Sequence, residues 1–180
     1  VLDFGVTGQL RNSDMVMYDR QTFTWWQQAV GQGIVGELMG VELTVFPSWM
    51  ESFGDFQARN PTGVVMAEPK YSRPYGNNPY RGYDSNARPF LFNGEFPPHG
   101  SEPLARVVRV GNRAWPLSRF SDGIREINQA GVTLTWEGNQ ASVLDQTSIA
   151  ISRKIAAIRT RDDAGNDIAH DVLFAFAFHA

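Results

Sequence analysis

The amino-acid sequence predicts an α+β fold that is rich in β-strands, built from antiparallel hairpins with two short helices. Short segments alternate apolar and polar residues, and Gly, Asn and Asp separate these segments at turns. Only two stretches place apolar residues at helical spacing. The 180 residues and the 42% hydrophobic content suit a single domain, residues 1–180, with its own core. A barrel-like closure of the hairpins stays open at this point.

Alternation predicts strands near the start of the chain and three hairpins further on. Residues 1–5, 15–18 and 23–28 are expected to be strands separated by polar turns. The hairpins are expected to pair residues 106–110 with 113–117, 132–136 with 141–144, and 155–161 with 168–178, around turns at 111–112, 138–139 and 163–166. In the last strand, the alternating phenylalanines would share one face.

The two helices are predicted from apolar spacing and from start and stop signals. The first covers residues 48–60, where Ser48 and Glu51 fit a capping box and Asn60 precedes a proline. The second carries Phe120 and Ile127 on one face and ends near residue 131, although an internal glycine weakens it.

Residues 68–99 interrupt this pattern with a long loop that holds most of the ten prolines and four of the five tyrosines. Linkers are seldom so aromatic, so we expect an ordered, packed loop, and long ordered loops are often functional.

Composition excludes several classes of protein. The net charge of −3 gives no basic surface for nucleic acid, and no apolar run approaches the roughly 20 residues that a membrane-spanning helix needs. The chain is free of cysteine, which excludes a thiol nucleophile and zinc sites built on thiolates. We therefore expect no cofactor, no metal site and no complete catalytic site within these residues. Both ends stop within strand patterns, so we expect a chain truncated at both ends.

Two short motifs favour structural interpretations. Gly31, Gly33 and Gly36 match the dinucleotide-binding pattern G-x-G-x-x-G, but the residues after them read as a strand rather than a helix. We interpret them as turn glycines in a β-meander. His170 and Asp171 could form part of a catalytic triad, but the sequence has no motif that would supply the nucleophile. We therefore interpret the two as a surface pair.

Two clusters remain as candidate binding sites. The first combines a polar turn with the end of a Trp pair and the two glutamines that follow it: Arg11, Asn12, Ser13, Asp14, Trp26, Gln27 and Gln28. The simpler interpretation is a pair of turns whose Asn and Asp side chains bond their own backbone. The second lies in the tyrosine-rich loop: Arg73, Tyr75, Asn78, Tyr80, Tyr83 and Asp84. Such residues stack on and hydrogen-bond to polar ligands, or the loop could instead lay its rings on the core.

Long motifs of this chain resemble a bacterial family, domain of unknown function 3179. The likeness includes Phe-Gly-Val-Thr-Gly-Gln-Leu-Arg-Asn-Ser-Asp at residues 4–14 and Arg-Ala-Trp-Pro-Leu at residues 113–117. It continues through residues 15–22, 26–28, 72–84, 131–136 and 171–180. The resemblance implies no assigned activity, an exported protein and a periplasmic or cell-envelope location.

The resemblance also implies a Cys-Pro-Leu-Cys-type motif upstream of the matched segment, which this chain lacks. Two hypotheses follow. In the first, the intact protein handles redox chemistry or a metal through those cysteines, and residues 11–14 and 26–28 form the polar wall around them. This requires the Arg11 turn to lie beside the N-terminus and to open onto a cleft. In the second, the loop binds a small polar ligand or a protein partner without chemistry, which requires at least two tyrosine rings exposed around a concavity.

Overall fold

The computed structural model describes residues 1–98, 101–121 and 123–180, so His99 at the end of the predicted loop lies outside the described residues. The fold is rich in antiparallel strands, with 36% strand and 12% helix, as the sequence predicts. Two compact units form. The first contains Val1–Phe46, Ala87–Leu104 and Leu173–Ala180, and the second contains Pro47–Asn86 and Ala105–Val172. The sheets of the described residues are separate and none closes into a barrel.

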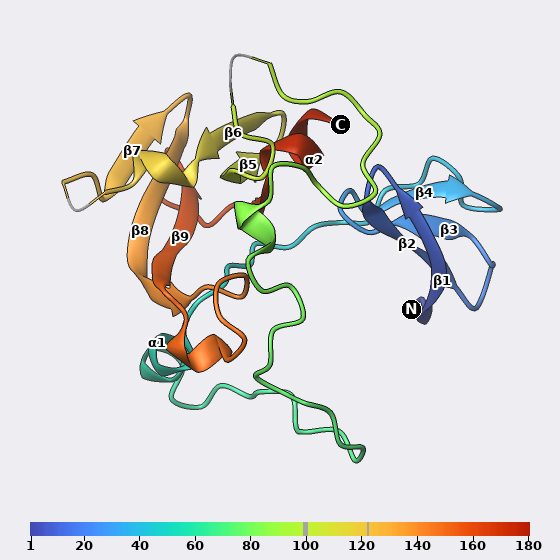
Figure 1. Ribbon diagram of the computed structural model, residues 1–180, viewed down its shortest axis with the longest axis horizontal. Coiled ribbons are helices and arrows are strands. Elements are labelled where there is room, and N and C mark those ends of the chain that lie inside the picture. The colour runs from blue at the N-terminus through green and yellow to red at the C-terminus, as the bar shows by residue number, and fades with distance from the viewer. Residues whose placement is uncertain (99–100, 122) are drawn as a thin grey trace. The chain divides into compact units, whose positions relative to one another are not determined.

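The first unit is built on a four-stranded meander, in which each strand pairs with the next along the chain (Figure 1). Its strands are β1 (Phe4–Arg11), β2 (Asp14–Asp19), β3 (Trp25–Gln27) and β4 (Gln32–Val35). Val16 and Trp26 are buried, and the Phe4 ring meets the Trp26 ring edge-on at 6.1 Å between centroids. The three expected strands at the start of the chain are therefore present.

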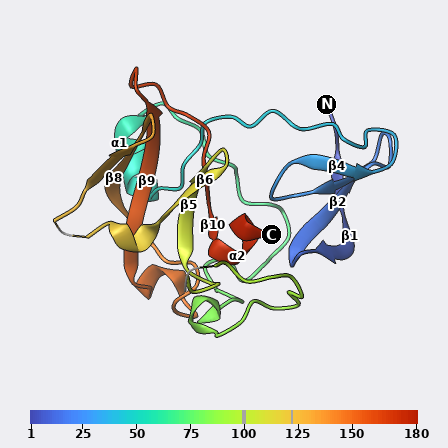
Figure 2. The ribbon, with the colours of Figure 1, turned by 90° about the horizontal axis from the view of Figure 1, so that it is seen from above.

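The second unit holds one complete sheet, the strands β5 (Arg106–Val110) and β6 (Arg113–Pro116) of another, and the main hydrophobic cluster. One sheet contains β7 (Glu126–Gln129), β8 (Val132–Ala141) and β9 (Lys154–Asp162), and Figure 2 shows β8 and β9 side by side. The other has the order β10, β5, β6, with β10 at Asp171–Phe174. The buried cluster consists of Val108, Trp115, Phe120, Ile127, Val132, Leu134 and Ile158.

The helices are α1 (Phe53–Arg59) and α2 (Ala175–His179), with single 3₁₀ turns at Tyr83–Ser85, Leu117–Arg119 and Ile149–Ile151. The prediction of a cap at Ser48 is wrong. Ser52 caps α1, and its Oγ accepts a hydrogen bond from the Asp55 N–H at 3.1 Å. Ser52 and Asp55 repeat the same Ser-x-x-acid spacing four residues later, and Glu51 pairs instead with Arg59.

The second predicted helix is also wrong, because its end forms β7. Ile127 lies directly opposite Leu134 of β8, and both side chains are buried. Burial against a partner strand overrides the helical spacing. Conversely, the tail predicted as a strand turns into α2 after Phe174. Phe176 is buried, and its N–H donates to the carbonyl of Pro103 at 2.9 Å.

Of the three predicted hairpins, the one around residues 111–112 is confirmed, since Val110 pairs with Arg113. The turn predicted at residues 138–139 is instead an irregularity within β8, where the register shifts between Trp136 and Asn139 and Gly138 has a φ of 90°. The turn at residues 163–166 forms, and Arg161 bridges back to Asp167, but the expected long pairing with β9 is absent because β10 lies beside β5.

Candidate functional site

Asn12 and Ser13 form a two-residue turn that joins β1 to β2, with Arg11 and Asp14 paired on either side. Both have positive φ angles, 52° and 65°, as a primed hairpin turn requires. A serine in this region costs roughly 1 kcal/mol, since only glycine adopts it freely. The Ser13 Oγ donates a hydrogen bond to the carbonyl of Phe90 in the same unit, which holds the turn in place.

Only part of the first predicted cluster comes together at this turn. The Arg11 Nη1 donates to the Gln27 Oε1 at 3.0 Å, and Gln27 is buried. The Asp14 carboxylate accepts the Ala29 N–H at 3.0 Å, so it bonds the backbone of a distant residue and not, as the simpler interpretation expects, that of its own turn. Gln28 is exposed. The structure thus joins Arg11 to Gln27 and gives Asp14 a structural role.

Trp26 does not join this turn but belongs to a hydrogen-bonded cluster centred on Asp19, at the end of β2. Asp19 is fully buried and accepts hydrogen bonds from the Trp26 Nε1 at 2.9 Å and from the Thr22 N–H at 2.6 Å. Burial alone would raise the pKa of Asp19, but hydrogen bonds from Trp26, Thr22 and Gln21 outweigh it and hold the pKa at about 2. The ionised carboxylate therefore fastens the turn between β2 and β3.

An open pocket of about 460 Å³ lies in the first unit. It is lined by Arg11 from the end of β1, and by Gln32, Gly33, Ile34, Val35, Met39 and Gly40. Of the first predicted cluster, Arg11 alone belongs to this lining.

The G-x-G-x-x-G glycines are turn and packing residues, as the sequence analysis favours. A Cβ on Gly33 would lie 2.3 Å from the carbonyl oxygen of Leu38. Gly36 has a φ of 107°, and a Cβ there would lie 2.9 Å from the Thr24 Cα. Both glycines permit close backbone approach within the meander, which explains the motif without a nucleotide.

Residues 71–84, called the tyrosine loop below, are tied to the segment 144–149 by their backbone. The Asn78 N–H donates to the carbonyl of Thr147 at 2.7 Å, and the Gly82 N–H donates to that of Leu144 at 2.7 Å. The Ile149 N–H donates to the carbonyl of Gly76 at 3.0 Å. Main-chain hydrogen bonds therefore hold residues 76–82 against this segment.

Within the tyrosine loop, Asn78 is an anchor rather than a ligand-binding side chain. It is 6% exposed, and its Nδ2 donates to the carbonyl of Gln146 at 3.2 Å. Its Oδ1 accepts the Tyr80 N–H at 2.7 Å. Asp84 plays a similar part, because its largely buried carboxylate pairs with Arg153 at 2.5 Å.

The tyrosine rings point outward. Tyr71, Tyr75 and Tyr80 are 59%, 58% and 63% exposed, so the alternative in which the loop lays these rings on the core is wrong. Tyr83 is half-buried and meets Tyr80 edge-on at 6.4 Å between centroids. The Arg73 guanidinium lies 4.9 Å from the centroid of the Tyr71 ring, a cation–π contact.

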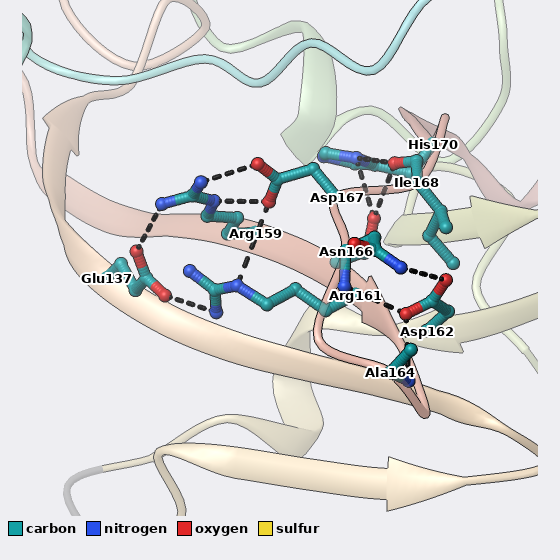
Figure 3. Close-up of polar contacts among 10 residues, drawn as sticks. Glu137, Arg159, Arg161, Asp162, Ala164, Asn166, Asp167, Ile168 and His170 are labelled. Atoms are coloured by element: carbon teal, nitrogen blue, oxygen red, sulfur yellow. Dashed lines mark hydrogen bonds and ion pairs between the residues drawn. The ribbon is translucent and has the colours of Figure 1, made fainter.

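A network of ion pairs joins β8, β9 and the turn after β9 (Figure 3). Asp167 receives two hydrogen bonds from Arg159, each of 2.5 Å, and Arg161 pairs with Glu137 at 2.6 Å. The Arg159 guanidinium also lies 4.4 Å from the centroid of the Trp49 ring. Sequence reasoning missed this network, although Arg159 and Arg161 occupy alternate strand positions and so share a face.

The charges of the network shift one another's pKa values. Hydrogen bonds from Arg159 lower the pKa of Asp167 below its usual 3.8 despite partial burial, and Asp167 in turn raises the pKa of Arg159. Burial would raise the pKa of Glu137, but Arg161 and Arg159 outweigh it and lower that pKa. Asp167, Glu137 and Arg159 are thus each stabilised in their charged forms, which indicates a structural clamp rather than an acid–base pair.

The interpretation of His170 and Asp171 as a surface pair is wrong. His170 is buried, its Nδ1 lies 2.9 Å from the Thr160 Oγ1, and burial lowers its pKa (Figure 3). Asp171 instead pairs with Arg109 at 3.5 Å. His170 therefore fills a position in the second unit as a neutral, hydrogen-bonded side chain.

Across residues 1–98, 101–121 and 123–180, no group of three or more metal-ligating side chains is arranged to hold an ion. Nor do these residues include a helix with the length and hydropathy needed to cross a bilayer. No curated protein and no solved structure matches the chain. A family model described as protein of unknown function, DUF3179, matches residues 1–180. The chain therefore belongs to the DUF3179 family.

Proposed function

We propose that this protein is a non-catalytic binding module and that the tyrosine loop is its contact surface for a protein partner. One observation carries the proposal: three tyrosine rings stand exposed on a loop whose backbone is hydrogen-bonded to its own unit. In the hydrophobic cluster of the same unit, by contrast, the aromatic side chains Trp115 and Phe120 are buried.

Tyrosine suits such a surface because it offers a large, stiff contact area and a hydroxyl at little cost in conformational entropy. The neighbouring Arg73 adds directional donors and is stacked on Tyr71 before any partner arrives. Because Asn78 and the main chain already order the loop, binding would lose little further entropy. These features favour a protein partner.

A small polar ligand is the alternative occupant of the same loop. Small-molecule sites are concave and enclose most of their ligand. The pocket of about 460 Å³ belongs to the first unit, and no residue of the tyrosine loop lines it. The outward rings therefore favour a broad partner surface over an enclosed ligand.

Redox or metal chemistry through cysteines outside these residues is the other hypothesis. It draws support from Arg11, which lines an open pocket. It also needs the Arg11 turn beside the N-terminus, but Val1 lies at the opposite end of β1 (Figure 1). At about 3.3 Å per residue, the strand separates the two by roughly 20 Å. This separation favours the binding proposal. The setting we propose for it is the periplasm or cell envelope, which the resemblance to exported-type proteins supports.

Photo-cross-linking in bacteria that carry the full-length gene tests the proposal. A benzophenone amino acid at position 75 or 80 should give the same discrete cross-linked protein, whereas the control position Val64, which is 90% exposed in the same unit, should give none. Excess wild-type chain should compete for the product, and the double variant Tyr75→Ala, Tyr80→Ala should compete poorly. Equal competition by the double variant, or equal products at position 64, would refute the proposal.

A further inference from the structure

The pocket of the first unit is the feature that neither the family nor the tyrosine loop accounts for. Its volume of about 460 Å³ falls within the range of roughly 300–1,000 Å³ that is typical of small-molecule sites. Within the described part of the chain, Arg11 is the one charged side chain in its lining. The pocket thus combines a single positive charge with a mainly apolar and glycine surface.

Arg11 is held in place without being neutralised. Its Nη1 donates to the amide oxygen of Gln27, a neutral group that is only 9% exposed. Among the described residues, no carboxylate pairs with Arg11, whereas Arg20, Arg153, Arg159 and Arg161 each pair with at least one. A guanidinium fixed at one nitrogen keeps other N–H donors for a carboxylate, whose two oxygens match the guanidinium fork.

The rest of the lining indicates the body of the ligand. Val35 and Met39 are 53% and 69% exposed, large apolar side chains that would gain from being covered. Ile34, which directly precedes Val35 in the chain, is half-buried. At Gly40 nothing lies within 4 Å of an added Cβ, so this side of the pocket is open space.

We propose that this pocket binds a small monocarboxylate with a short apolar body, the carboxylate on Arg11 and the apolar part against Val35 and Met39. The inference is independent of the tyrosine loop, because every residue it uses lies in the first unit.

Titration of the ¹⁵N-labelled chain with hexanoate, followed by NMR, tests this inference. Hexanoate should shift the amide resonances of Gly33, Met39 and Gly40 saturably at millimolar concentration. The matched probes 1-hexanol and hexylamine have the same chain without a negative charge, and they should bind at least about tenfold more weakly. Equal binding of hexanol would overturn the role of Arg11, and an absence of saturable shifts would overturn the site.

Variants separate the pocket from general charge effects. Arg11→Gln should weaken hexanoate binding about tenfold or more, since it removes one charge-assisted interaction. Arg20→Gln, which removes an exposed cation outside the pocket lining, should bind hexanoate as the wild type does. An unshifted Trp26 indole resonance verifies that each variant keeps the fold of this unit. Equal weakening by both variants would overturn the proposal.

Discussion

Replacement of Gly33 by alanine should destabilise the first unit strongly, because β4 has no room for a methyl group there. The added Cβ would lie 2.3 Å from the Leu38 oxygen and 3.1 Å from the Leu38 carbonyl carbon. Ordinary contact begins at 3.4 Å, so the carbonyl must move by about 1 Å. That carbonyl also accepts the Val41 N–H at 3.1 Å. Overpacking of about 1–3 kcal/mol and a weakened hydrogen bond of about 1 kcal/mol together predict a loss of about 3 kcal/mol.

Urea denaturation measures this loss, with the Trp26 indole N–H resonance as the probe, since that group bonds Asp19 within the first unit. Gly40→Ala is the control, because its Cβ meets nothing within 4 Å and only its φ of 85° is unfavourable. This control should cost about 1 kcal/mol. If Gly33→Ala costs no more than Gly40→Ala, the steric argument is refuted.

The remaining predictions concern buried polar contacts. Asn78→Ala should lower the free energy of unfolding of the second unit by about 1–3 kcal/mol, while Tyr80→Ala should change it by less than about 0.5 kcal/mol; equal losses in chemical denaturation would contradict the division between anchor and exposed ring. Asp167→Asn should cost about 1–3 kcal/mol at pH 7 by the same measurement, and an unchanged midpoint would show that the clamp adds nothing. Because the pKa of Asp167 is lowered from 3.8, its stabilisation is present above pH 3.8 and lost as pH falls below it. The stabilisation from ionised Asp19 depends on pH in the same direction and is lost as pH falls from about 4 through its pKa of about 2. A ¹³C titration of the Asp19 carboxyl group with a midpoint near 3.8 would contradict this.

Local signals in the sequence predict the fold well where a short turn decides the pairing. Gly111 and the residue after it set the β5–β6 register without help from distant residues. Prediction fails where a partner strand decides: Ile127 has helical spacing with Phe120, yet Leu134 on β8 draws it into a sheet. The bulge at Gly138 likewise depends on β9, which continues the pairing beyond Trp136.

The candidate sites divide in the same way. Asp19 accepts the N–H groups of Gln21 and Thr22 in the turn that follows it, and sequence alone predicts such contacts for an aspartate at a turn. Asp14 instead accepts the N–H of Ala29, which is distant along the chain. Asn78 looks like a ligand-binding residue in the sequence because its partner carbonyl at Gln146 is distant along the chain. The pairing of Asp167 with Arg159 is closer in sequence and lies across the predicted turn at residues 163–166, but the turn alone does not specify which side chains meet across it.

In the tyrosine loop, the groups that order the backbone differ from the side chains that face solvent, and this has a practical consequence. The contacts that shape the loop use main-chain atoms and Asn78, whereas Tyr71, Tyr75 and Tyr80 contribute outward rings. Those three positions can therefore be randomised as a combinatorial library on an unchanged frame. The protein offers a starting scaffold for selecting new recognition specificities, in which the amino acids that meet the target are exchanged while the loop keeps its course.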